Sequence, residues 1–169
     1  YHGIAHTSRV LFGTCLIVHH YPDIDESLKE GIYYSAIIHD LGKSSDTEGA
    51  IHGSKSEQLY KSKIGEFIPD VTIQSLVLSA IKYHSVEDRD CPISIQNNLI
   101  WKVLKDADAL DRGRFSKKCD KSYLRLDLFK TDLGKLIISF MDELPHRTSQ
   151  LSWNNPYTEL TNCIKQIIK

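Results

Sequence analysis

Eight histidines stand out in this chain of 169 residues, because several of them lie beside acidic or glycine residues. His39 directly precedes Asp40, and His52 directly precedes Gly53. Imidazole nitrogens and carboxylate oxygens are the ligands that zinc, manganese and iron ions accept in proteins, and a carboxylate can bridge two ions. The types and neighbours of these residues therefore direct the search for function towards metal chemistry.

Four ionisable residues continue apolar stripes with the spacing of three to four residues that defines one face of a helix. We therefore expect their side chains to point towards packed surface, where an ionisable group is costly unless it is paired or bound to a metal. One such histidine alone would usually be a core residue bonded to a backbone carbonyl, but together they favour a metal site. The four residues are His6, His39, His84 and Asp108.

The apolar periodicity predicts helices along the whole chain, and no alternating strand pattern is found in the sequence. Two helix starts carry capping boxes, Asp23 with Glu26 and Ser54 with Glu57. We therefore expect an all-α fold, a single-domain helical bundle over residues 1–169. The expected helices cover about 4–20, 23–41, 54–65, 70–84, 94–112 (capped by Ser94), 126–141 and 157–168, with a polar stretch at 113–122.

The charge balance excludes several classes of function. The 21 basic and 22 acidic residues are interspersed, so no basic surface for nucleic acid or for an anionic membrane is expected. No apolar run approaches the roughly 20 residues of a membrane helix, and no leader pattern is found, which favours a cytoplasmic protein. The four cysteines are far apart and are expected to be reduced and mostly buried.

Three motifs occur in a characteristic order: His6 with Arg9-Val10, then His39-Asp40-Leu41-Gly42-Lys43, then Asp106-Ala107-Asp108-Ala109-Leu110-Asp111. This order resembles the HD-domain superfamily of metal-dependent phosphohydrolases, over about residues 2–114. The resemblance implies a helical fold in which His6, His39, Asp40 and a late aspartate hold one divalent metal ion.

Helical periodicity alone lets either Asp106 or Asp108 be the late aspartate. Relatives with an Ala-Asp-x-Leu segment use the aspartate that follows the alanine, so the resemblance selects Asp108. Asp106 and Asp111 are then expected to be solvated, or to be carboxylates that orient a ligand histidine.

Two further histidines extend the resemblance to the two-metal branches of the superfamily. His52 and His84 occupy the places where those branches carry additional ligands, and six ligands would suit two ions with Asp40 as the bridge. The alternative for His52 is a solvated or phosphate-contacting residue at a helix start. One or two divalent ions are therefore expected, with Mn, Fe, Zn, Mg and Ni as the candidates.

Four residues are candidates for contact with a substrate. Lys43 follows the metal motif directly, so it could place a cation against a phosphate or the leaving oxygen; the alternative is an ordinary lysine at a helix C-terminus. Arg9 and Arg112 could form bidentate phosphate contacts, and His2 lies one helical turn before the first ligand. Asp40 and Lys43 are the residues expected to carry catalysis.

The expected activity is hydrolysis of a phosphoester or phosphoanhydride bond in a small phosphorylated substrate by metal-activated water. A nucleotide is favoured, because neither a basic groove nor an aromatic platform for a polynucleotide is found. Two alternatives stay open: a di-iron oxygenase of the same superfamily, and a regulatory module that only senses a nucleotide. The helices after residue 126 lie outside the resemblance, where they could shape the pocket or a homodimer interface.

Overall fold

The computed structural model describes residues 3–21, 24–45, 47–112 and 123–167. All regular elements within these ranges are helical, which confirms the all-α class for the described part of the chain. The α-helices are α1 (Ile4–His19), α2 (Glu26–Ile38), α3 (Ile51–Tyr60), α4 (Val71–Tyr83), α5 (Ile93–Gln96), α6 (Leu99–Leu110), α7 (Asp132–Arg147) and α8 (Pro156–Ile167). Between these α-helices lie the short 3-10 helices η1 (Ile64–Glu66), η2 (Asp88–Asp90) and η5 (Asp127–Lys130).

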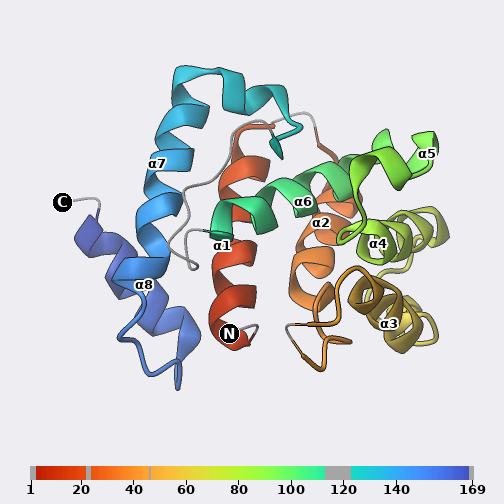
Figure 1. Ribbon diagram of the computed structural model, residues 1–169, viewed down its shortest axis with the longest axis horizontal. Helices are drawn as coiled ribbons and strands as arrows, with labels where there is room; N and C mark the ends of the chain where they lie inside the picture. The colour runs from red at the N-terminus through yellow and green to blue at the C-terminus, as the bar shows by residue number, and fades with distance from the viewer. Residues whose placement is uncertain (1–2, 22–23, 46, 113–122, 168–169) are drawn as a thin grey trace.

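Helices α1, α2, α4 and α6 form the centre of the molecule. Helix α6 runs across α1 and α2 and contacts both of them as well as α4 (Figure 1). Helix α3 packs on α4 at one side of this centre, and α7 and α8 contact α1 at the other (Figure 1). Their shared core contains fully buried side chains from each central helix, such as Ile17, Ile32, Val77 and Leu104.

Helix α1 fully buries one face, with Leu11, Phe12 and Leu16 partly buried, although the sequence predicts a helix that is buried on most sides. The buried face includes three polar residues, His6, Arg9 and Thr14, whereas Ile4 and Cys15 are exposed. The expectation of buried cysteines is therefore wrong for Cys15 and correct for Cys91 and Cys163, while Cys119 lies outside the described residues.

Several helices begin at residues other than the expected caps. Helix α2 is capped by Asp25, whose carboxylate accepts the Leu28 amide proton at 2.8 Å, while Asp23 lies outside the described residues. Helix α6 is capped by Asn98 and not by Ser94. The Asn98 side chain accepts from the amide of Ile100 at 2.9 Å and donates to the Leu76 carbonyl at 2.8 Å, so it fixes α6 on α4 while it starts the helix.

Helix α3 begins at Ile51, so Ser54 lies inside it and is not its cap. This helix packs very closely on the end of α4, because Gly53 has no side chain. A Cβ atom at Gly53 would lie 2.7 Å from the carbonyl oxygens of both Ile81 and Lys82. The missing side chain therefore allows α3 to carry His52 up to the C-terminal end of α4.

One of the two C-terminal helices differs from the sequence prediction, whereas α8 (Pro156–Ile167) agrees with the helix expected over 157–168. The expected helix over 126–141 is instead the short η5 followed by α7, which extends to Arg147. Thr131 separates the two elements, because its hydroxyl oxygen accepts the Gly134 amide proton at 3.0 Å and caps α7. None of the helices in the described ranges combines the length and the apolar character needed to cross a membrane.

Candidate metal centre

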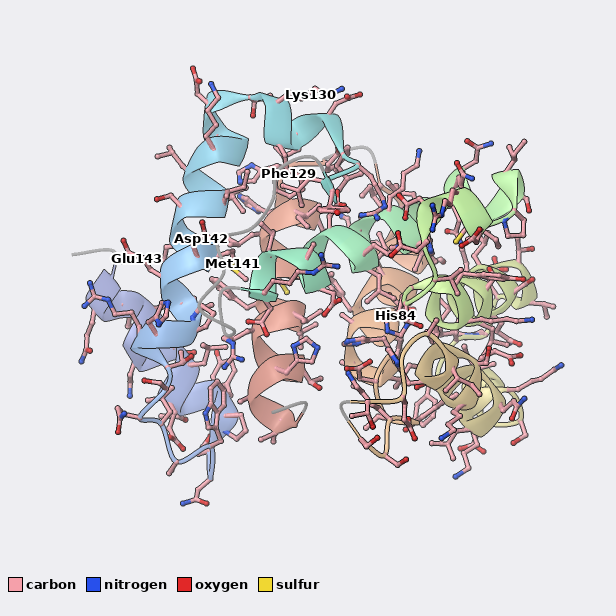
Figure 2. All side chains as sticks on the ribbon, viewed as in Figure 1. His84, Phe129, Lys130, Met141, Asp142 and Glu143 are labelled. Atoms are coloured by element: carbon pink, nitrogen blue, oxygen red, sulfur yellow. The ribbon has the colours of Figure 1, made fainter. Side chains whose placement is uncertain are left out.

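Six ligand-type side chains, expected from the sequence, meet where five helices come together. Figure 2 shows His84 among the side chains between α2, α3 and α4. The residues come from α1 (His6), from the C-terminal end of α2 (His39 and Asp40), from α3 (His52), from the end of α4 (His84) and from α6 (Asp108).

The first group consists of His6, His39, Asp40 and Asp108. The Nε2 atoms of His6 and His39 lie 3.2 Å apart. The Nε2 atom of His6 lies 3.6 Å from Oδ2 of Asp40 and 3.3 Å from Oδ1 of Asp108. Both imidazoles are fully buried, whereas the side chains of Asp40 and Asp108 are 10% and 26% exposed, so the group is open to the surface on the side of its carboxylates.

The second group consists of Asp40, His52 and His84. The Nε2 atoms of the two histidines lie 3.0 Å apart, and each lies 3.2 Å from Oδ1 of Asp40. Asp40 thus faces His6 through Oδ2 and the second group through Oδ1, while Nε2 of His39 lies 3.8 Å from Oδ1. This shared carboxylate has the arrangement expected of a bridging ligand between two ions.

The Nδ1 atom of each histidine faces an acceptor, and this fixes the orientation of the ring. A carbonyl oxygen can only accept, so the Nδ1 atoms of the three histidines that face carbonyls carry the proton. In a neutral ring the Nε2 atom is then a lone pair available to a metal. The donor pairs are His39 with Ala36 (2.9 Å), His52 with Gly49 (2.5 Å), His84 with Ile81 (2.7 Å) and His6 with the Asp111 carboxylate (2.7 Å).

When both rings of a pair are neutral, their Nε2 lone pairs face each other, at 3.2 Å between His6 and His39 and at 3.0 Å between His52 and His84. That contact is repulsive unless a proton or a metal ion lies between the two atoms. Metal–nitrogen bonds of about 2.0–2.1 Å place two imidazole nitrogens on one ion about 3 Å apart. The donor set and its spacing fit a divalent transition metal in each group.

The protonation states of the buried ligands agree with this fit. Burial, followed by the positive charge that His84 can carry, lowers the pKa of His39 to about 3, so its imidazole is neutral at pH 7. Burial raises the pKa of Asp40, but hydrogen bonds from His52 and His84, which need a proton on Nε2, outweigh burial and keep that pKa well below its usual value. A metal ion in place of those protons would keep the carboxylate in the same ionised form, while His39 already offers a neutral nitrogen.

The structure separates the three aspartates of α6. Asp108 belongs to the first group, as the resemblance implies. Asp106 is fully buried elsewhere and accepts the amide protons of Arg125 and Leu126 at 2.9 Å. Asp111 accepts from Nδ1 of His6, so it is a carboxylate that orients a ligand histidine.

The candidate substrate residues lie in different places. Lys43 and Arg112 line a cavity of about 930 Å³ that also contains Asp40, His52, His84 and Asp108 in its wall. Arg9 is outside this lining, and its guanidinium is buried against Asp111 and Thr148. Those contacts favour a role for Arg9 in holding Asp111 over a role in contacting substrate, and His2 lies outside the described residues.

Several charged residues of the cavity wall were missed by the sequence analysis, among them Asp88, Lys105 and Arg125. Asp88 accepts from Nζ of Lys105 and from Nη2 of Arg125, each at 2.7 Å. Lys105 precedes Asp108 by three residues on α6, so helical spacing alone could have identified it. Arg125 follows a polar stretch, and no pattern in the sequence points to it.

A scan against protein-family models, a search of curated proteins and a search of solved structures each gave no match to this chain. The case for a metal centre therefore depends on the residues and their geometry.

Proposed function

We propose that this chain is a metal-dependent phosphohydrolase of the HD-domain type, acting on a small phosphorylated substrate. The observation that carries the proposal is the pair of ligand groups that share Asp40 and that both reach the wall of a large cavity. A metal ion at each group would supply a hydroxide nucleophile at neutral pH and neutralise charge on phosphoryl oxygens. The protein's own side chains would orient the ligands, attract the phosphoryl oxygens and deliver the proton.

The ligand residues hold their positions before any substrate arrives. His39, His52 and His84 are oriented by backbone carbonyls of their own helices or of the preceding turn, and Asp40 joins the two groups. Such preorganisation keeps the reacting groups in place without a reorganisation cost during the reaction.

Lys43 is the residue best placed to serve the substrate. Its Nζ atom lies 4.0 Å from Oδ2 of Asp40, and its side chain is nearly buried in the cavity wall. An ammonium group there attracts the phosphoryl oxygens and can deliver a proton to the leaving oxygen. Lys43 therefore lies next to the carboxylate that the two ligand groups share.

The cavity supports an anionic, metabolite-sized substrate. A volume of about 930 Å³ lies within the usual range of small-molecule sites. Arg112 lines it with its guanidinium 5.6 Å from the ring of Tyr123, which gives a flat cationic and aromatic surface for a phosphorylated ligand such as a nucleotide.

The test is to purify the full chain without chelator or metal-affinity resin and to determine its metal content by elemental analysis. Phosphate release is then measured on nucleotides, sugar phosphates and p-nitrophenyl phosphate after loading with Mn²⁺, Fe²⁺, Zn²⁺, Mg²⁺ or Ni²⁺. We expect about two equivalents of transition metal and metal-dependent phosphate release. Asp106→Asn is the matched control, because Asp106 is a buried aspartate outside both groups.

Two results would overturn the proposal. Absence of bound metal after reconstitution would remove the site and favour a module that only senses a nucleotide. Bound iron with substrate-dependent oxygen uptake and without phosphate release would replace hydrolysis by oxygenase chemistry.

A further inference from the structure

The C-terminal segment reaches the first metal-ligand group through a chain of buried polar contacts. It begins at His6, whose Nδ1 donates to Oδ2 of Asp111 at 2.7 Å. Asp111 also accepts from Nε of Arg9 at 2.6 Å and from Nη2 at 3.3 Å. The His6 and Asp111 side chains are fully buried, and that of Arg9 is 7% exposed, so these contacts are protected from competition by water.

Arg9 is held in turn by the C-terminal segment. Its Nη1 donates to the hydroxyl oxygen of Thr148 at 3.3 Å, and that hydroxyl donates to the Leu144 carbonyl at 2.8 Å. The Arg9 guanidinium carbon also lies 5.8 Å from the centre of the Trp153 ring. The guanidinium therefore contacts a carboxylate of α6 and residues at and beyond the end of α7.

The loop that carries Trp153 is itself tied to α8. The carboxylate of Glu159 accepts the backbone amide protons of Ser152 at 2.8 Å, Trp153 at 3.1 Å and Asn155 at 3.0 Å. Helices α7 and α8 both contact α1, the helix that carries His6 and Arg9 (Figure 1). Docking of the C-terminal helices and the position of Arg9 are therefore linked.

The Nδ1 contacts of the second group are local, as is that of His39 in the first group. The Nδ1 atoms of His52 and His84 donate to the carbonyls of Gly49 and Ile81, three residues earlier in the same part of the chain. A backbone carbonyl of the local turn keeps its place wherever the C-terminal helices are. The Nδ1 atoms of His52 and His84 thus bond a neutral carbonyl nearby in the sequence. Nδ1 of His6 instead bonds a carboxylate 105 positions away.

We propose that residues 144–160 act through Arg9 and Asp111 as a positioning device for His6, and so set the metal affinity of the first group but not of the second. This inference rests on the proposed metal centre. It assigns a role to the C-terminal helices, because the ring of His6 presents Nε2 to the ion only while Asp111 holds its Nδ1 proton. Asp111, Arg9 and Thr148 are positioning residues in this device.

The experiment separates the two groups by substitution and titrates each with Co²⁺, followed by visible absorption. In a His84→Ala background the first group remains, and in a His39→Ala/Asp108→Ala background, which leaves only His6 and Asp40 in the first group, the second remains. Asp111→Asn should weaken Co²⁺ binding about 10–100-fold in the first background and leave the second unchanged. It should also shift the cobalt absorption bands of the first group, which a general loss of stability does not do.

Two conservative variants keep the proposal testable if Asp111→Asn does not fold. Arg9→Lys retains the charge but cannot bond two Asp111 oxygens and Thr148 together, so it should weaken the first group about 10-fold. Thr148→Val removes one acceptor with little change of shape and should give a smaller loss in the same direction. Asp106→Asn, an equally buried change on the same helix, should alter neither group.

The metal-free protein gives an independent measurement. Proton NMR with ¹⁵N-labelled histidine should show a strongly downfield, exchange-protected Nδ1 proton for His6 that disappears in Asp111→Asn and shifts in Thr148→Val. Unchanged cobalt affinity in all three variants would overturn the positioning device while leaving the metal centre intact. Failure of the parent protein to bind Co²⁺ would overturn the metal centre itself, and this inference with it.

Discussion

The two ligand groups differ in what supports them, although they share Asp40. Both groups reach the cavity wall, the first through Asp40 and Asp108 and the second through Asp40, His52 and His84. In the first group, Nδ1 of His6 is held by a charged network from α1, α6 and the C-terminal segment, whereas Nδ1 of each histidine in the second group is held by a carbonyl close in sequence. The difference teaches that the orientation of one histidine can depend on remote packing, while that of another is set by its own turn.

The largest expected effect comes from the residue that the groups share. Asp40→Asn keeps the size of the side chain but removes the negative charge between the two sets of Nε2 atoms. We expect loss of both metal equivalents and of phosphate release, measured by elemental analysis and a phosphate assay. Full activity in this variant would contradict the metal model.

His84→Ala should separate the groups. It removes one nitrogen of the second group, whose remaining side chains are Asp40 and His52. We expect metal content to fall from about two equivalents to about one, because two remaining ligands hold an ion poorly. His39→Ala/Asp108→Ala is the counterpart for the first group, because it also leaves two ligands. If His84→Ala lost both equivalents, the groups would have to be treated as one cooperative site.

Lys43→Met should affect turnover without affecting either group. The substitution keeps the length of the side chain and removes the ammonium group beside Asp40. We expect kcat to fall about 10²-fold or more at unchanged metal content, as for the loss of a proton donor. The loss should be smaller for p-nitrophenyl phosphate, whose leaving group needs no proton. A fall in metal content in Lys43→Met would instead indicate a structural role.

Gly53→Ala gives the smallest and most selective effect. The new Cβ would press on the carbonyl oxygens of Ile81 and Lys82 and push α3, with His52, away from α4. We expect a loss of stability of about 1–3 kcal/mol by thermal or denaturant unfolding, together with weaker metal binding at the second group only. Gly65→Ala is the matched control, because the nearest atom to its added Cβ is a side-chain amide at 3.5 Å. Equal stability of the two variants would show that α3 can move without cost.

Much of the candidate site could be predicted from residue types and helical faces. The stripes that end in His39 and His84 predicted inward-facing imidazoles, and both are buried as expected. The helix starts were less predictable, because several residues near each start can accept an amide proton. Asn98 became the cap of α6 since its side chain also bonds the Leu76 carbonyl of α4, a contact that the local sequence does not contain.

The sequence by itself determined the helical class and the supply of imidazole and carboxylate ligands, because both depend on residue type and on spacing along one helix. Helical periodicity left the roles of Asp106, Asp108 and Asp111 open, and the tertiary structure decided them. Asp106 and Asp108 are separated by about 200° around the helix axis, while Asp108 and Asp111 lie on nearly the same side. Packing of α6 across α1 turned that side towards His6, so Asp108 faces Nε2 and Asp111 holds Nδ1. The rotation of one helix against another is set by contacts between distant residues, and for that reason it cannot be obtained from either helix alone.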